Sequence, residues 1–392
     1  MEENLIEQLS LFGLDELRLE TLDKEKIHPL RPLKVCSLFS GIGGFETGFF
    51  EAFGSQNVEV VFASEIDPHA AKSYEALYGV APYGDITKIK ASSIPDHDVL
   101  VGGFPCQAFS IAGKRQGFED TRGTLFFDVV RILKEKKPRT VILENVKNLI
   151  SHDNSQTIEV ILTTLSEIGY YIDFDILNSR YFNSPQSRDR IYIIGQYNHP
   201  KQNWIKGDYS AKVWRIKKKL MQKYRGLKTF NFCFPAKQRV NASIADILES
   251  NPDPKYFLPN HIAIEMKNRI TSEDLNFLPE QYIRKITDIP HELHKDLERQ
   301  RRLYSITGCS PTLLARSDTP KIYFEVEDKP RIRKLTPLEC LRLQGFPVGY
   351  YSILRQAKVS DTQIYKQVGN AVTTNVIQAL VGKLSTFYVQ KS

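Results

Sequence analysis

Between Lys34 and Gln196 the sequence alternates short apolar segments with longer amphipathic ones. A chain that alternates strands with helices builds a mostly parallel sheet with helices on both faces, so the predicted fold class is α/β. The segments expected to be strands are Val35–Phe39, Val58–Ala63, Val99–Val101, Thr140–Leu143, Ile172–Leu177 and Ile191–Ile194. The segments expected to be helices are Phe45–Phe53, Pro68–Leu77, Thr124–Lys136 and Ser155–Ile168.

The alternation is lost from Tyr197 to about Ile332. Basic, aromatic and proline-containing stretches take its place, without an internal repeat or a low-complexity tract. This part of the chain predicts a second domain with little regular periodicity. Order then returns, because Thr336–Leu343 predicts a helix and the segment after Gln367 predicts a final helix through about Phe387.

Length and composition are those of a globular protein. The 392 residues are 41% hydrophobic and 25% charged, enough for a large core and for two domains. No apolar run resembles a signal peptide or a transmembrane helix, so we expect the protein to act where it is made, in the cytoplasm or nucleoid. The five cysteines lie far apart without CxxC spacing, which argues against a zinc site and a disulfide framework.

Positive charge is concentrated between Lys201 and Arg239. The formal net charge of the chain is +7, but this segment has twelve basic residues and one acid, Asp208, which leaves a negative remainder. A local basic region on a mildly acidic body is typical of a protein that binds a polyanion. Interleaved aromatic residues favour this interpretation over a merely solvated surface. They are Trp204, Tyr209, Trp214, Tyr224, Phe230 and Phe232.

A cysteine follows the third apolar segment, in the sequence Gly-Gly-Phe-Pro-Cys-Gln-Ala-Phe-Ser. The two glycines let the loop run close to a bound molecule, and Pro105 fixes one backbone angle beside the sulfur. Loops at the carboxyl ends of parallel strands are where ligands bind in open α/β sheets. A buried structural cysteine is the alternative, but the neighbouring motifs favour Cys106 as a nucleophile.

A glycine turn, Phe39–Gly44, follows the first strand and begins a helix, so its backbone N–H groups can face a ligand. It is not the dinucleotide-binding fingerprint, because Glu46 stands where the third glycine is required. Glu65 closes the second strand, where a ribose diol needs acceptors, and Asp85 is placed to accept from an adenine amino group. Two such carboxylates without a diphosphate loop favour S-adenosylmethionine over NAD.

Taken together, these stretches resemble the DNA (cytosine-5)-methyltransferases, above all the short bacterial enzymes that accompany restriction systems. The resemblance covers Lys34 to Tyr197 and Arg333 to Val381, with the motifs in the family's order. Ser37 stands where many members have Asp, a departure from which we expect little consequence. The matching segments are Phe39–Gly44, Glu65–Ile66, Asp85–Ile86, Pro105–Gln107, Gly117–Leu125, Glu144–Val146, Gln186–Arg190, Arg342–Pro347 and Gln367–Val372.

The resemblance implies a Rossmann-like S-adenosyl-L-methionine-dependent fold, with S-adenosyl-L-homocysteine as the product and no metal. Glu65 would bind the ribose, while Phe39 and Ile66 would lie against the adenine ring. The cofactor-binding residues implied are Phe39, Gly41, Ile42, Gly43, Gly44, Glu65, Ile66, Asp85, Ile86, Pro105, Leu125, Asn370 and Val372.

The chemistry of the family explains the catalytic residue types. Carbon 5 of cytosine is a poor nucleophile, and addition of the Cys106 thiolate at carbon 6 gives an enamine that can attack a methyl donor. Glu144 would protonate or hydrogen-bond N3, Arg188 would hold O2 as charge builds, and Arg190 would orient Glu144. Asn145 is expected to brace the turn. The implied catalytic set is Cys106, Gln107, Glu144, Asn145, Arg188 and Arg190.

The same resemblance implies how the chain is divided. Residues 1–33 would be an N-terminal arm, 34–200 and 350–392 the two parts of a large catalytic domain, 201–332 a small target-recognition domain and 333–349 a hinge segment. Double-stranded DNA would lie between the domains with the target cytosine rotated out of the stack. A monomer without membrane contact is expected, and a cognate restriction endonuclease encoded nearby would not touch it. The residues expected to contact DNA are Ser110, Gln186, Thr307, Gly308, Thr312 and Arg316.

Two other functions stay open at this level. The first is the same chemistry on RNA, since a small branch of the family methylates tRNA; the basic middle segment favours duplex DNA. The second is a catalytically silent, cofactor-bound DNA-binding or regulatory protein, against which the intact Cys106 motif argues.

Overall fold

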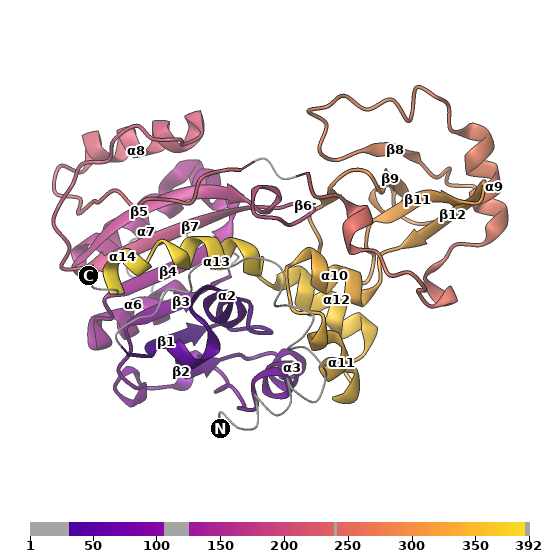
Figure 1. Cartoon of the computed structure of the whole chain (residues 1–392). Helices are drawn as coiled ribbons and strands as arrows, with labels where there is room; N and C mark the ends of the chain where they lie inside the picture. Colours follow the sequence, from indigo (N-terminus) through magenta and orange to yellow (C-terminus); the bar gives the residue numbers. More distant parts are fainter. Residues whose placement is uncertain (1–30, 106–124, 239–240, 389–392) are drawn as a thin grey trace.

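The computed structural model describes residues 31–105, 125–238 and 241–388. Its largest sheet consists of β1 (Leu33–Leu38), β2 (Val58–Ser64), β3 (Val99–Gly102), β4 (Thr140–Val146), β5 (Tyr170–Asn178) and β7 (Asp189–Tyr197). Their order across the sheet is β2-β1-β3-β4-β7-β5 (Figure 1). Strand β7 is antiparallel to β4 and β5, and the other neighbouring pairs are parallel. The predicted α/β class is confirmed.

Helices cover both faces of this sheet. On one face, α6 (Leu125–Lys136) and α7 (Gln156–Glu167) bury their apolar sides in a single core. On the other face, α2 (Gly44–Phe53) packs against α13 (Thr374–Gly382), although they come from opposite ends of the chain (Figure 1). The final helix predicted through Phe387 is interrupted, because α14 (Ser385–Tyr388) is a separate turn.

A third group of helices lies beside the large sheet and shares its own core. It consists of α3 (Pro68–Tyr78), α10 (Pro337–Leu343), α11 (Gly349–Gln356) and α12 (Asp361–Asn370). The start of α10 follows from the sequence. Thr336 accepts from the Glu339 N–H, the Glu339 side chain accepts from the Thr336 N–H, and Pro337 stands in the first turn.

The smaller domain is built on a four-stranded sheet in the order β12-β11-β9-β8, with α9 (Asn260–Arg269) packed on it. Its strands are β8 (Lys285–Asp288), β9 (Arg302–Ser305), β11 (Lys321–Val326) and β12 (Lys329–Lys334). It is more regular than the sequence suggested, because strands of four to six residues rich in charge give little periodic signal. The ion pair between Arg333 and Glu339, buried at both ends (2.6 Å), joins β12 to α10.

The segment from residue 201 to 238 packs against the large sheet rather than the small one. Helix α8 (Ala211–Lys223) buries Val213 and Leu220 in the core that holds α7. Phe230 and Phe232 enter the core on the opposite face. The boundaries predicted at residues 201 and 333 therefore differ from the packing: the amphipathic α8 stays with the large domain, and residue 333 lies inside β12.

Shorter elements connect these parts. Strands β6 (Gln186–Ser187) and β10 (Ser310–Pro311) pair and link the two domains. Short 3₁₀ helices are η1 (Ser55–Asn57), η2 (Ile86–Lys88), η3 (Ala91–Ser93), η5 (Lys147–Ser155), η6 (Ser179–Tyr181), η7 (Ile244–Ile247), η8 (Pro254–Tyr256) and η9 (Glu298–Arg301). Of the helices in the described ranges, none is both long and apolar enough to cross a membrane.

Candidate active site

The carboxyl ends of β1 to β4 meet at one edge of the large sheet. The glycine turn follows β1, Glu65 follows β2, the loop through Pro105 follows β3, and Glu144 and Asn145 lie at the end of β4. Because these strands are parallel neighbours, residues distant in sequence come together at this edge.

The glycine turn has a left-handed backbone conformation that residues other than glycine adopt poorly. Gly41 and Gly43 have φ angles of 57° and 78°. The Gly41 N–H donates to Glu65 Oε2 at 2.9 Å, and the Asp67 N–H donates to Glu65 Oε1 at 2.7 Å. These two bonds orient the Glu65 carboxylate beside the turn, as a ribose-binding acceptor requires. A Cβ on Gly41 would meet nothing within 4 Å, so this side of the turn is open to a ligand.

The C-terminal part of the chain closes the other side of this turn. A Cβ on Gly44 would lie 2.7 Å from Val372 Cγ2, so the turn is in close contact with the segment that joins α12 to α13. Ile42 is buried in the core that holds α10 to α12. Asn370, at the end of α12, is exposed. These placements fit a cofactor pocket built from both ends of the chain.

The predicted adenine-side residues have different surroundings. Ile66 is 69% exposed, which is unusual for an isoleucine unless a ligand covers it. Phe39, with a φ of 57°, packs at the margin of the core. Asp85 accepts from the Thr87 N–H and hydroxyl, and these hydrogen bonds lower its pKa. Ile86 is buried, and Leu125 is half-buried at the first turn of α6.

Glu144 is the buried carboxyl at the centre of the catalytic edge. Its Oε1 lies 2.9 Å from Nε of Arg190 on the neighbouring strand β7. Its Oε2 would lie 3.2 Å from a Cβ built on Gly103, so the carboxyl faces the loop that leads to Cys106. Burial raises the pKa of Glu144, and the positive charges of Arg190 and Arg188 oppose that rise.

Asn145 fastens the same loop to β4. Its Nδ2 donates to the Phe104 carbonyl at 2.7 Å, and its Oδ1 accepts from the Val146 N–H at 2.9 Å. These two hydrogen bonds are the kind of contact expected of a residue that braces the turn. Pro105 is exposed at the end of the described loop. The predicted residues Cys106, Gln107 and Ser110 lie outside the described residues.

Arg190 and Thr312 line a small pocket of about 200 Å³ beside Glu144, together with Val146, Lys147, Asn148 and Asp189. Lys147 Nζ lies 2.6 Å from Asp189 Oδ2, and Asn178 Nδ2 donates to Asp189 Oδ1 at 2.8 Å. The sequence analysis missed Lys147 and Asp189. The available signal was their position, since Lys147 directly follows the matched Glu144–Val146 segment and Asp189 lies within the matched Gln186–Arg190 segment.

Arg188 does not have the role predicted for it. Its side chain is 2% exposed, and its terminal nitrogens donate to the carbonyls of Leu313 (3.2 Å), Gly369 (3.0 Å) and Ala371 (2.9 Å). Burial lowers its pKa to about 9, so the guanidinium is still charged at neutral pH. Both terminal nitrogens of Arg188 are bonded to backbone carbonyls, and the residue does not line the pocket beside Glu144, so it is not placed to hold a base oxygen there. It fastens β7 to the small-domain loop and to α12.

Gln186 is also internal, which corrects its assignment as a DNA contact. Its side chain is fully buried, accepts from the Leu313 N–H at 2.9 Å and donates to Gln344 Oε1 at 3.3 Å. Its neighbours on β6 and β10 explain this burial, since both strands lie where the two domains meet. Thr312 donates to the Ser187 carbonyl at 2.7 Å from the same junction.

The remaining predicted DNA contacts lie on the small domain. Thr307 is exposed and accepts from Arg284 Nη1 at 2.8 Å. Gly308 is buried, and a Cβ there would lie 2.8 Å from Arg284 Cβ, so this close approach requires glycine. Arg316 is half exposed and pairs with Asp318 at 3.1 Å. Arg284 is the neighbour that the sequence analysis did not single out.

Known proteins that are similar to this chain are DNA methylases and related methyltransferases. The C-5 cytosine-specific DNA methylase family matches residues 33–386. The type II methyltransferase M1.ScrFI of Lactococcus lactis subsp. cremoris is 39% identical over 353 residues, which are 90% of this chain and 77% of that protein. The orphan methyltransferase M.SPRI of Bacillus phage SPR is 34% identical over 440 residues, covering 92% of this chain and 99% of that protein. The crystal structure of the S. pombe Dnmt2 methyltransferase shares the fold, with a TM-score of 0.59 and 19% identity over 91% of this chain and 99% of that one.

The sheet, its catalytic edge and these matches define a DNA methyltransferase. More closely, the chain belongs to the C-5 cytosine-specific DNA methylase family, and it is a DNA (cytosine-5)-methyltransferase.

Proposed function

We propose that this enzyme methylates a cytosine that has been rotated out of duplex DNA, through a transient bond between the Cys106 sulfur and carbon 6 of the base. The observation that carries the proposal is the environment of Glu144. This carboxyl is buried, paired with Arg190 at 2.9 Å and directed at Gly103, three residues before Cys106. A buried carboxyl that faces the residues leading to a cysteine, with a pocket beside it, fits addition of that cysteine to a pyrimidine ring.

The covalent step follows from the chemistry of the base. The Cys106 thiolate adds to carbon 6, and the electron pair of the 5,6 double bond becomes available at carbon 5. Carbon 5 then takes the methyl group, its proton leaves to a base, and the bond between sulfur and carbon 6 breaks to restore the ring. Cys106 is therefore regenerated in each turnover.

Glu144 and Arg190 would contact different atoms of the target base. The raised pKa of Glu144 increases the protonated fraction near neutral pH, and a protonated carboxyl can donate to N3. Arg190 fixes the Glu144 carboxyl through Nε and also lines the pocket. We assign to Arg190 the stabilisation of O2, in place of Arg188.

The residues around the glycine turn fit S-adenosyl-L-methionine, which supplies the methyl group when bound. Glu65 would bind the ribose hydroxyls, because its carboxylate is oriented by the Gly41 and Asp67 N–H groups. Ile66 would cover the adenine. The Gly41–Gly44 turn and Val372 would enclose the methionine end.

The wider assignments are part of the same proposal. Residues 241–332 would form most of the target-recognition domain, and one chain would act as a monomer. The relative M1.ScrFI is a type II methyltransferase, so we propose that this enzyme is the modification partner of a restriction endonuclease. Some relatives are orphan methyltransferases, and an adjacent endonuclease gene decides between the two roles. Its DNA substrate places the activity in the bacterial cytoplasm and nucleoid.

The test compares purified wild type, Cys106→Ser and Glu144→Gln, supplied with labelled S-adenosylmethionine and genomic duplex DNA. Wild type should form 5-methylcytosine and a covalent complex with 5-fluorocytosine DNA. Cys106→Ser should do neither, and Glu144→Gln should lose roughly 10²- to 10⁴-fold in kcat, the range of general acid catalysis. Full activity of Cys106→Ser, or methyl transfer to tRNA but not to duplex DNA, would overturn the proposal.

A further inference from the structure

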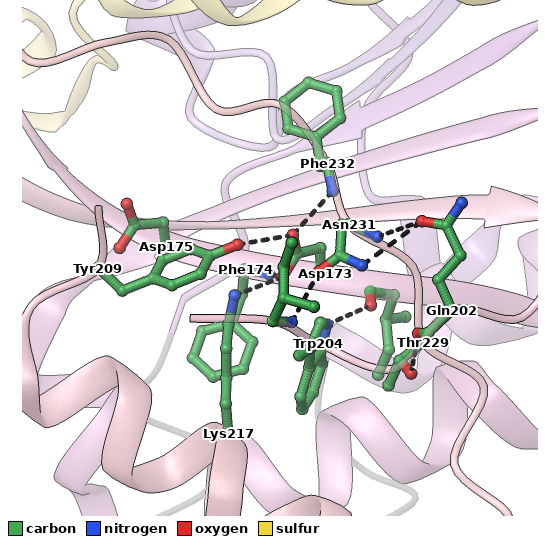
Figure 2. A network of polar contacts seen from close by, with 12 residues as sticks. Asp173, Phe174, Asp175, Gln202, Trp204, Tyr209, Lys217, Thr229, Asn231 and Phe232 are labelled. Carbon is green, nitrogen blue, oxygen red and sulfur yellow. Dashed lines mark hydrogen bonds and ion pairs between the residues drawn. The ribbon is translucent and has the colours of Figure 1, made fainter. Parts of the chain in front are cut away.

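Helix α8 is fixed to the edge of the large sheet by a buried ion pair (Figure 2). Lys217 Nζ lies 2.5 Å from Asp173 Oδ1 on β5, and both side chains are fully buried. The same ammonium lies 3.4 Å from the centroid of the Tyr209 ring, whose hydroxyl donates to Asp173 Oδ2 at 3.2 Å. The Phe232 N–H donates to the same oxygen at 2.9 Å. Burying one charge of this pair without the other would cost much free energy, so these contacts hold α8 in one orientation.

The outward face of α8 is basic and unneutralised. The helix contains no acidic residue, and Lys212, Arg215, Lys218 and Lys219 are all exposed. Within residues 31–105, 125–238 and 241–388, these four make no ion pair within 4 Å. The C-terminal end is partly neutralised, because Lys223 pairs with Glu159 of α7 and Lys219 also lies in the electrostatic field of that carboxylate.

Some exposed basic groups elsewhere in the chain have partners close to them in the sequence. Arg269 pairs with Glu265 four residues away, and Arg302 pairs with Glu298 at the same spacing. Such pairs are the ordinary way in which a solvated surface balances its charge. The four side chains on α8 lack this local compensation, so their mutual repulsion would be relieved by a bound polyanion.

The position of α8 separates it from the small domain. In Figure 1 it lies over β5, on the side of the large domain away from the sheet formed by β8, β9, β11 and β12. Its C-terminal end meets Glu159 in the first turn of α7. Helix α7 follows η5 directly, and the first residues of η5, Lys147 and Asn148, line the pocket beside Glu144. The elements η5 and α7 therefore connect the pocket to the C-terminal end of α8.

We propose that the exposed face of α8 is a second DNA-binding surface, which contacts the phosphates of the duplex that flanks the target site. The proposal rests on duplex DNA being the substrate. A 13-residue helix is about 20 Å long, which matches roughly six base-pair steps of a duplex. Contacts of lysine and arginine to phosphates carry no sequence information, so this surface adds affinity, whereas the small domain and the pocket select the site.

The experiment compares two duplexes that contain the target site, which is first mapped by bisulfite sequencing of DNA from cells that express the chain. One duplex is about 14 base pairs long, and the other extends it to about 40 base pairs. Binding is measured by fluorescence anisotropy over a series of KCl concentrations. The test variant is K212Q/R215Q/K218Q/K219Q. Each lost phosphate contact should lower the slope of log K against log[KCl] by about 0.9, so the four should lower it by about 3 to 4 on the long duplex.

Between 50 and 200 mM KCl this slope difference corresponds to an affinity change of about 10²-fold, by the same relation. On the short duplex, affinity, kcat and KM should match those of wild type. The matched control K34Q/K90Q/K134Q/K137Q removes four exposed charges near the amino ends of β1, β3 and β4, at the opposite edge of the sheet. It should leave the slope on both duplexes close to that of wild type.

Three results would overturn the proposal: equal slopes for the α8 variant and wild type on the long duplex, an equal loss on both duplexes, or a loss of tRNA binding without a loss of duplex binding. Circular dichroism and thermal unfolding verify that the α8 variant is folded, which its exposed positions lead us to expect. Failure of wild type to methylate either duplex would instead refute the proposed function, so the two failures are distinguishable.

Discussion

Arg188 lies directly before β7 and Arg190 lies within it, yet their side chains have different surroundings. Replacing Arg188 with Met removes three charge-assisted hydrogen bonds to the carbonyls of Leu313, Gly369 and Ala371. Breaking a buried, hydrogen-bonded charge typically costs about 3–5 kcal/mol. With an unfolding entropy of about 2.1 cal/mol/K per residue, 392 residues give roughly 0.8 kcal/mol/K, so the Tm should fall by about 4–6 °C.

The assay measures Tm and kcat for Arg188→Met and Arg190→Met side by side. Arg190 is the matched control, because it lines the pocket, pairs with Glu144 through Nε and is only half-buried. Arg190→Met should lower kcat by 10²-fold or more, the loss typical of a transition-state contact, with a Tm shift under about 2 °C. If Arg188→Met kept the wild-type Tm and lost 10²-fold in kcat, the structural role assigned to Arg188 would be refuted.

Three further predictions concern the framework of the site. Burial raises the pKa of Glu46 to about 7, so the folded state keeps a proton that the unfolded state releases above about pH 4.5. As the pH rises from 5 to 8, the free energy of unfolding of wild type should therefore fall by up to about 3 kcal/mol, and its Tm should fall with it. Glu46→Gln should flatten this pH profile. Asn145→Ala removes the hydrogen bond to the Phe104 carbonyl and should lower kcat roughly 10- to 100-fold with little change in DNA affinity, as single-turnover and binding measurements would show. A Cβ on Gly369 would lie 2.1 Å from the Leu314 carbonyl oxygen, so Gly369→Ala should lower both Tm and activity, and unchanged values would contradict the close approach.

The residues predicted for the cofactor and the base edge lie together in the structure because each is at or just after the carboxyl end of a strand of the parallel sheet. Glu65, Glu144 and Asn145 belong to short segments whose order fixes their place once the strands are recognised. Their partners are backbone groups of neighbouring strand ends, as with the Gly41 N–H on Glu65. Topology alone therefore brings them together.

The residues that were misassigned depend on partners far away in the sequence. Arg188 binds carbonyls that lie 125 to 183 residues later, and nothing near it in the sequence indicates that these carbonyls surround it. Gln186 is internal for the same reason, because Leu313 and Gln344 close over it. The basic segment was assigned to the wrong domain since its charge is visible in the sequence, whereas the buried pairing of Lys217 with Asp173 is not.

The contact of Val372 with Gly44 has a consequence for synthesis of the enzyme on the ribosome. The glycine turn emerges early, but the wall against which it closes is translated more than three hundred residues later. A nascent chain that has made β1 to β4 still lacks the segment that packs against this turn. If the turn holds the methyl donor as proposed, we expect an unfinished polypeptide that stops before α12 to be inactive, even with the motifs up to Arg190 in place.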